Sequence, residues 1–174
     1  MLQTQSPQSR IVAVGLFGAI SIVLGIVENF IPLPVPGLRL GLANLGVMMM
    51  LYIGGLVPAM MVMILKVTLV PLLSGNIFFR LSLSVPSGVM AFIAMAVFAL
   101  ILRKYSSAVS VGVAGAVFHM ITQLYVIDKL YIKGIFSTAI VGWFLLAAVV
   151  TGILTGIITQ LSVERIKSAV RAFG

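Results

Sequence analysis

The sequence contains little of what soluble proteins and enzymes use. Of its 174 residues, 8% are charged, three are acidic, one is histidine and none is cysteine. Soluble domains carry roughly 25% charged residues, so a soluble fold of this size could not cover its apolar surface. The absence of cysteine excludes disulfides and thiolate metal sites. One histidine and three dispersed acids cannot assemble a zinc site or a carboxylate cluster for Mg²⁺.

Motifs for ATP hydrolysis and nucleophilic catalysis are also missing. The sequence contains no Walker A segment and no nucleophile elbow, so we expect a protein that is not an enzyme and needs no cofactor. The eleven basic residues give a net charge of +8, but they are scattered through an apolar chain. This distribution argues against a nucleic-acid partner and is typical of topology signals and contacts with anionic lipid.

Apolar residues are what the sequence has in abundance. They make up 61% of the chain, and the mean hydropathy is +1.27. A spanning helix needs about 20 mostly apolar residues. The composition therefore predicts an all-α, polytopic membrane protein, with about six helices in one compact bundle and a single domain over residues 1–174. Residues 1–10 are expected to form a polar tail and residues 162–174 a basic cytoplasmic tail. The helices are predicted at about 11–27, 41–53, 57–73, 81–102, 108–127 and 135–161.

Lysine and arginine are distributed unequally between the two sides of this six-helix arrangement. With the N-terminus inside, four basic residues lie outside: Arg39, Arg80, Lys129 and Lys133. The inner side then holds Arg10, Arg103, Lys104, Arg165, Lys167 and Arg171. Because cytoplasmic loops carry an excess of such residues, we expect a multi-pass protein of the plasma membrane with both termini in the cytoplasm.

The most informative stretch connects the first two apolar segments. It runs from Glu28 to Leu51 and reads ENFIPLPVPGLRLGLANLGVMMML. A polar junction stiffened by proline and glycine favours a binding site over a simple connector. Glu28, Arg39 and Asn44 are its candidate residues, and Arg80 flanks the next outer loop. Each alone is typical of a cap or an interface anchor, but their shared outer placement favours a binding mouth.

Three further polar residues lie within apolar helices. Lys66 stands in the middle of MVMILKVTLVPLL, where a charge is costly and indicates function by default. It either meets an anionic substrate or pairs with Glu28, or else it snorkels or fixes helix packing. His119 and Gln123 are spaced i, i+4 and share a helix face. They either bind a ligand or form a hydrogen bond between helices.

Small residues four positions apart mark two helices. Gly15 and Ala19 have this spacing in the first helix, and Gly152 and Gly156 repeat it in the last. The spacing allows close helix approach, which serves either a partner protein or internal packing.

Three segments resemble a known bacterial membrane family. ENFIPLPVPGLRLGLANLG, LLSGNIFFRLSLSVPSG and GAVFHMITQL are similar to heptaprenyl diphosphate synthase component I, also called the Gx transporter family, over roughly residues 11–160. Prenyl-chain synthases bind diphosphates through paired aspartate-rich motifs and Mg²⁺, whereas this chain has one aspartate, Asp128. We therefore do not expect catalysis.

The size, the short helices and the outer loop also resemble the substrate-binding component of energy-coupling-factor transporters. That resemblance implies capture of a small molecule from outside, here an anionic one such as a quinone or isoprenoid precursor. It also implies a coupling transmembrane subunit and ATPases as partners. The coupling subunit would dock on Gly15 and Ala19. The alternatives are a noncatalytic membrane subunit that assists a soluble prenyl diphosphate synthase, and a stand-alone carrier. The lack of inverted repeats argues against the carrier.

Overall fold

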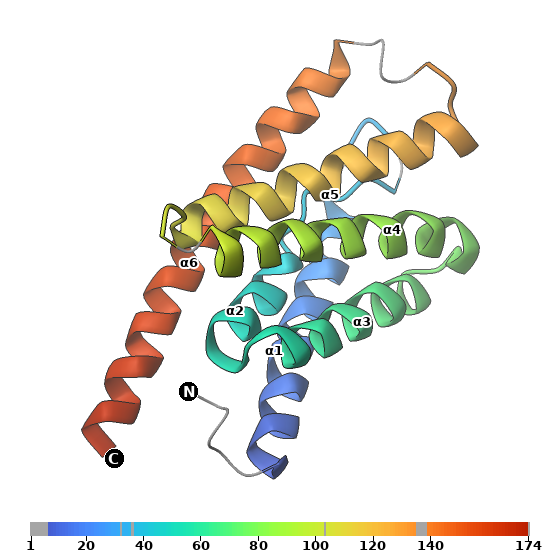
Figure 1. Cartoon of the computed structure of the whole chain (residues 1–174). Helices are drawn as coiled ribbons and strands as arrows, with labels where there is room; N and C mark the ends of the chain where they lie inside the picture. The colour runs from blue at the N-terminus through green and yellow to red at the C-terminus, as the bar shows by residue number, and fades with distance from the viewer. Residues whose placement is uncertain (1–6, 32, 36, 103, 135–138, 174) are drawn as a thin grey trace.

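The computed structural model describes residues 7–31, 33–35, 37–102, 104–134 and 139–173, and these are helical without strands (Figure 1). A 3-10 turn over Glu28–Phe30 extends the first helix, and a π-helical turn over Val97–Ile101 extends the fourth. The α-helices are α1 (Pro7–Val27), α2 (Asn44–Gly54), α3 (Leu56–Leu73), α4 (Ile77–Ala96), α5 (Ala108–Leu130) and α6 (Ile140–Phe173). The predicted all-α bundle is confirmed.

Five of these helices are long and apolar enough to cross a membrane, and α2 is shorter. Its 11 residues rise about 16 Å, against a hydrocarbon thickness of about 30 Å. The non-helical residues 38–43 precede it, and four of the six are buried and two half-buried. Fully extended backbone would add about 3.3 Å per residue, so segment and helix together span at most roughly 36 Å, and the turn over residues 41–44 shortens this span. Protein rather than lipid covers this backbone, which is the condition for irregular structure at membrane depth.

Helix boundaries differ from the predicted ones at both ends of the chain. Residues 7–10 of the expected polar tail belong to α1, and α6 continues unbroken to Phe173 instead of ending near residue 161. No glycine or proline stands between residues 157 and 173 to end it. The predicted start of this helix, at residue 135, lies outside the described residues. α4 begins at Ile77 rather than near residue 81, so Pro86 lies inside this helix.

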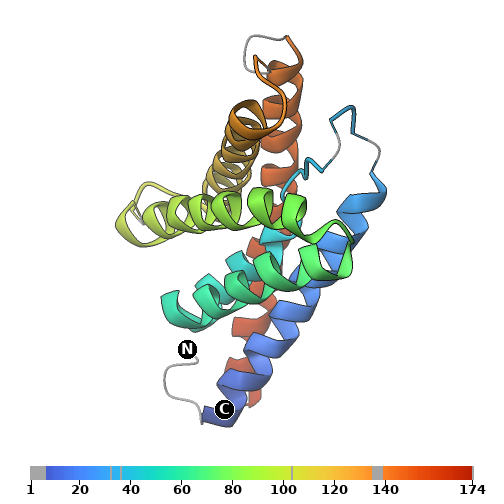
Figure 2. The same cartoon turned by 90° about the vertical axis from the view of Figure 1, so that its right-hand side faces the viewer.

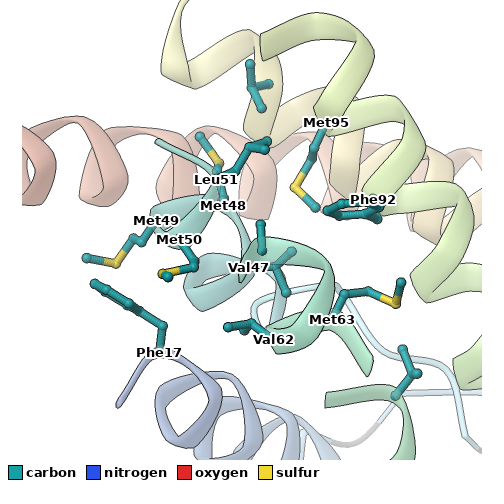
Figure 3. Packing of buried hydrophobic residues seen from close by; sticks show 13 residues of the cluster. Phe17, Val47, Met48, Met49, Met50, Leu51, Val62, Met63, Phe92 and Met95 are labelled. Atoms are coloured by element: carbon teal, nitrogen blue, oxygen red, sulfur yellow. The ribbon is translucent and has the colours of Figure 1, made fainter. Parts of the chain in front are cut away.

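Two apolar clusters form the core. One is rich in methionine and joins α1–α4 through residues such as Phe17, Met48, Val62 and Met95 (Figure 3). The other joins the 31–43 segment to α4, α5 and α6 through Leu38, Leu83, Met120 and Phe144. Polar residues separate the two clusters along the chain: Asn44 stands between Leu38 and Val47, and Ser87 between Leu83 and Phe92. The bundle therefore has a polar layer between two apolar ones.

α5 and α6 approach closely through glycines. A Cβ on Gly152 would lie 2.6 Å from Val113 Cα, and one on Gly156 would lie 2.5 Å from Val109 Cα. The small-residue pattern of α6 thus serves internal packing. The start of α1 and the end of α6 lie at the same end of the molecule in both views, with the 31–43 segment toward the other end (Figures 1 and 2).

Candidate functional site

Hydrogen bonds from three helices hold the backbone of residues 39–42. Glu28 Oε1, at the end of α1, accepts from Leu42 N at 2.6 Å. Gln123 Oε1 of α5 accepts from Arg39 N at 2.9 Å. On α6, Thr151 Oγ1 donates to the Leu40 carbonyl at 3.0 Å. Since this segment has no helical hydrogen bonds of its own, these side chains satisfy backbone groups that lipid could not. These bonds hold the backbone from which the Arg39 side chain extends.

Lys66 and Asn44 form the centre of the polar layer. Lys66 is 3% exposed, and its Nζ donates to Asn44 Oδ1 at 2.5 Å. Among the described residues, no ion pair joins Lys66 to Glu28.

 
Among those residues, the amide oxygen of Asn44 therefore takes the place of the predicted carboxylate partner. Lys66 does not snorkel, because its amine ends inside the bundle rather than at an interface.

His119 and Gln123 form a hydrogen-bonded chain that ends on α4. Gln123 Nε2 donates to His119 Nδ1 at 2.8 Å, while His119 Nε2 lies 3.3 Å from Ser87 Oγ. Ser87 Oγ donates in turn to the Leu83 carbonyl at 2.6 Å. This order requires the neutral imidazole with its proton on Nε2. Because Gln123 also accepts from Arg39 N, its amide is fully engaged in holding α4, α5 and the loop together.

Arg80 lies at the outer edge of the site. Its guanidinium donates to Asn29 Oδ1, and Asn29 Nδ2 donates to Ser74 Oγ at 2.8 Å. This chain connects the ends of α1, α3 and α4. Asn76 adopts a left-handed conformation with φ 46° and directly precedes the first residue of α4.

Three buried polar atoms in this layer have no hydrogen-bond partner among the described residues: Glu28 Oε2, Arg39 Nε and Asn44 Nδ2. Their side chains are 2%, 7% and 4% exposed. Buried polar atoms are rarely left without a partner, and each such atom asks for an explanation.

Two spaces lie on either side of the loop. The outer one has a volume of about 280 Å³ and is lined by Glu28, Asn29, Ile31, Leu33, Val35, Gly37, Leu38 and Arg80. The inner one has room for about one water molecule, and its lining includes Arg39, Ser84, His119 and Gln123. Gly37 and Arg80 border both spaces. The structure thus brings the predicted site residues together around one segment of backbone.

Some residues that hold the site could not be recognised from the sequence. Asn29, Ser87 and Thr151 hold the site, yet small hydroxyl and amide residues are common in membrane helices and have no diagnostic spacing. Outside this site, Gly15 and Ala19 are exposed on α1, and no atom lies within 4 Å of a Cβ built on Gly15. Their pattern therefore does not serve packing within the described chain. No group of three His, Asp or Glu in the described ranges could hold a metal ion.

Comparison with known proteins identifies the family. No curated protein and no solved structure matches the chain. The family model of heptaprenyl diphosphate synthase component I matches residues 17–162, which include α2 to α5, parts of α1 and α6, and every residue of the polar layer. The chain therefore belongs to the heptaprenyl diphosphate synthase component I family.

Proposed function

We propose that the chain is the substrate-binding membrane subunit of an energy-coupling-factor type uptake transporter. In this role it captures a small anionic molecule, such as a quinone or isoprenoid precursor, from outside the cell. The observation that carries the proposal is the polar layer beneath the 31–43 loop. Buried Glu28, Arg39 and Asn44 keep polar atoms there without a partner among the described residues, and Glu28 lines the outer cavity together with Arg80. A chain that lacks nucleotide-hydrolysis motifs needs ATPases and a coupling subunit to drive release inside.

The exposed face of α1 supports the partner assignment. Gly15 and Ala19 leave a shallow strip on α1 that the rest of the described chain does not cover. Small residues let another helix approach closely within a membrane. We assign this strip to the coupling subunit.

The second candidate function follows from the family name. It is a noncatalytic membrane subunit that assists a soluble prenyl diphosphate synthase. This role requires no small-molecule site in the chain itself, so it leaves the unpartnered buried atoms without a purpose.

Co-purification from native membranes separates the two functions. The tagged parent should retain a membrane coupling protein and ATPases, and Ala19→Leu should lose both, because the larger side chain blocks close approach. Gly142→Leu is the matched control, since its Cβ also meets open space but lies on α6. A soluble prenyl synthase in the eluate, with no ATPases, would establish the second function instead. Unaltered recovery of the partners with Ala19→Leu would remove the docking assignment.

A further inference from the structure

We propose that the chain binds one anionic phospholipid in a cavity between the start of α1 and the turn that joins α2 to α3. The cavity has a volume of about 800 Å³, and no residue of the polar layer lines it. Its lining includes Arg10, Ile11 and Val14 of α1 and Leu56, Val57 and Met61 of α3. The proposal goes beyond the uptake function and does not depend on it.

The lining of this cavity changes in character with membrane depth. Arg10 lies in the first turn of α1, and Leu56 is the first residue of α3. Both helices are long and apolar enough to cross a membrane, so their first residues lie near its interface. At a rise of about 1.5 Å per residue, Val14 lies about 6 Å beyond Arg10, and Met61 about 7.5 Å beyond Leu56. The cavity therefore extends from a cation at the interface to apolar side chains in the hydrocarbon region.

The apolar part of the cavity fits an acyl chain. Ile11, Leu56, Val57 and Met61 are all exposed in the described chain, so the cavity is open to its surroundings. Water finds no hydrogen-bond partner among such side chains, and apolar spaces stay dry. Small-molecule sites occupy roughly 300–1,000 Å³, so about 800 Å³ is more than a lipid head group alone would need. An acyl chain of the surrounding bilayer supplies apolar groups for the remaining space.

The charge at the interface selects the head group. Arginine binds phosphate through two parallel hydrogen bonds, which favours a phospholipid over a neutral lipid at Arg10. A zwitterionic head group brings its own cation beside the guanidinium, whereas an anionic head group brings only negative charge. The predicted orientation also places this end of the molecule in the cytoplasmic leaflet, where anionic lipids make the surface potential negative. The cavity and the leaflet therefore favour the same class of lipid.

Diffuse attraction between basic residues and anionic lipid must be separated from binding in the cavity. Arg165 provides the comparison, because it is exposed near the end of α6 and is not among the residues that line the cavity. The end of α6 lies at the same end of the molecule as the start of α1 (Figures 1 and 2). Arg10→Gln and Arg165→Gln thus remove the same charge from the same end of the protein, but only the first changes the cavity.

Titration of the delipidated protein in neutral detergent tests the head-group preference. Native mass spectrometry with dioleoyl phosphatidylglycerol and dioleoyl phosphatidylcholine counts the lipids bound and ranks their affinities. We expect one phosphatidylglycerol to bind more tightly than phosphatidylcholine by roughly fivefold or more, the factor that one arginine near an anionic surface provides. Arg10→Gln should abolish this preference, and Arg165→Gln should keep it. Equal affinities in the parent, a preference that survives Arg10→Gln, or equal loss in both variants would overturn the proposal.

Filling the cavity gives a second test. Val57→Trp places an indole in the space and should weaken phosphatidylglycerol binding, while Ile64→Trp should not. Ile64 is the matched control because it is also exposed on α3 but is not among the lining residues. If Val57→Trp leaves lipid binding unchanged and instead loses the coupling subunit, a protein partner occupies the cavity and the proposal is wrong. The lipid titrations need no ATPase or substrate, so their failure is distinct from failure of the uptake function.

Discussion

The side chains of the polar layer fall into two groups: those whose polar atoms are all hydrogen-bonded, and those that keep a polar atom without a partner among the described residues. Gln123 uses both ends of its amide, on Arg39 N and on His119, so it holds the site together. Asn44 uses its oxygen on Lys66 but leaves its Nδ2 without a partner among the described residues. An unpartnered atom can form a new hydrogen bond without breaking an existing one, whereas a hydrogen-bonded atom cannot. The side-chain amides of Gln123 and Asn44 therefore have different roles.

The bond between Asn44 and Lys66 makes a testable prediction about stability. Asn44→Leu should destabilise the protein by about 3–5 kcal/mol, because it leaves the Lys66 amine buried without its partner. Adding Lys66→Met removes the stranded charge and should restore most of the loss. Thermal and denaturant unfolding of the two single variants and the double variant in detergent measure this coupling. Additive losses in the double variant would mean that the two side chains do not support each other.

Sequence reasoning found those residues that are unusual for a membrane helix. Lys66 and His119 stand out because charge and imidazole are rare among apolar neighbours, and Arg39 because it follows three prolines. It considered Glu28 but not Asn44 as the partner of Lys66, since the partner depends on how the loop folds back between helices. The anchoring role of Thr151 was equally hidden, because its acceptor is a backbone carbonyl 111 residues away.

Among whole elements, α5 and α6 depend on each other most visibly. Their contact is built on Gly112, Gly152 and Gly156, at which a Cβ would lie within 2.6 Å of backbone atoms of the facing helix. Backbone cannot move aside as the end of a flexible side chain can. Because these glycines have no side chain, α5 and α6 approach more closely than a larger residue at these positions would allow.

Substitution of these glycines should separate the helices. Gly152→Ala is expected to destabilise the protein by about 1–3 kcal/mol, the usual cost of overpacking a tight contact. Gly142→Ala in the same helix meets open space and should be neutral or slightly stabilising, because alanine favours helix. Melting temperatures of the two variants, compared with the parent, provide the measurement. Equal behaviour of both variants would contradict the close contact.

Helix existence could be predicted from the sequence more securely than helix ends. Long apolar runs predicted the five spanning helices, since burial in lipid requires them. The predicted end of α6 near residue 161 is too early, because Arg165 and its basic neighbours, which are predicted to form a tail, continue the helix. The crossing by residues 38–54 combines an irregular half with a short helix. Apolar length alone does not reveal that combination, because packing on α5 and α6 makes it possible.

For the molecule as a whole, the start of α1 and the end of α6 lie at the same end, away from the loop that covers the site (Figures 1 and 2). If the 38–54 segment completes a crossing, an even number of passes returns the chain to its starting side. The positive-inside rule then places both ends in the cytoplasm. Which side the ends occupy is a prediction that labelling can check.

The cysteine-free chain makes that labelling direct. Single cysteines at exposed Tyr105 and Ser168 should react with an impermeant thiol reagent only after cells are permeabilised. A cysteine at exposed Lys133, between α5 and α6, should react in intact cells and is the positive control. Labelling of Tyr105→Cys or Ser168→Cys from outside would reverse the orientation.

The three bonds to residues 39–42 also have a consequence for biosynthesis. Glu28 is made before the loop, but Gln123 and Thr151 emerge much later, and Thr151 follows Leu40 by 111 residues. At a synthesis rate of ~5–20 residues per second, the Leu40 carbonyl waits roughly 5–20 seconds for its donor. The loop is held only from α1 until Gln123 is made, and from α1 and α5 until Thr151 follows. The ribosome has therefore made nearly the whole chain before the binding site can close, and a chain that ends before α6 inserts would lack one of its three fastenings.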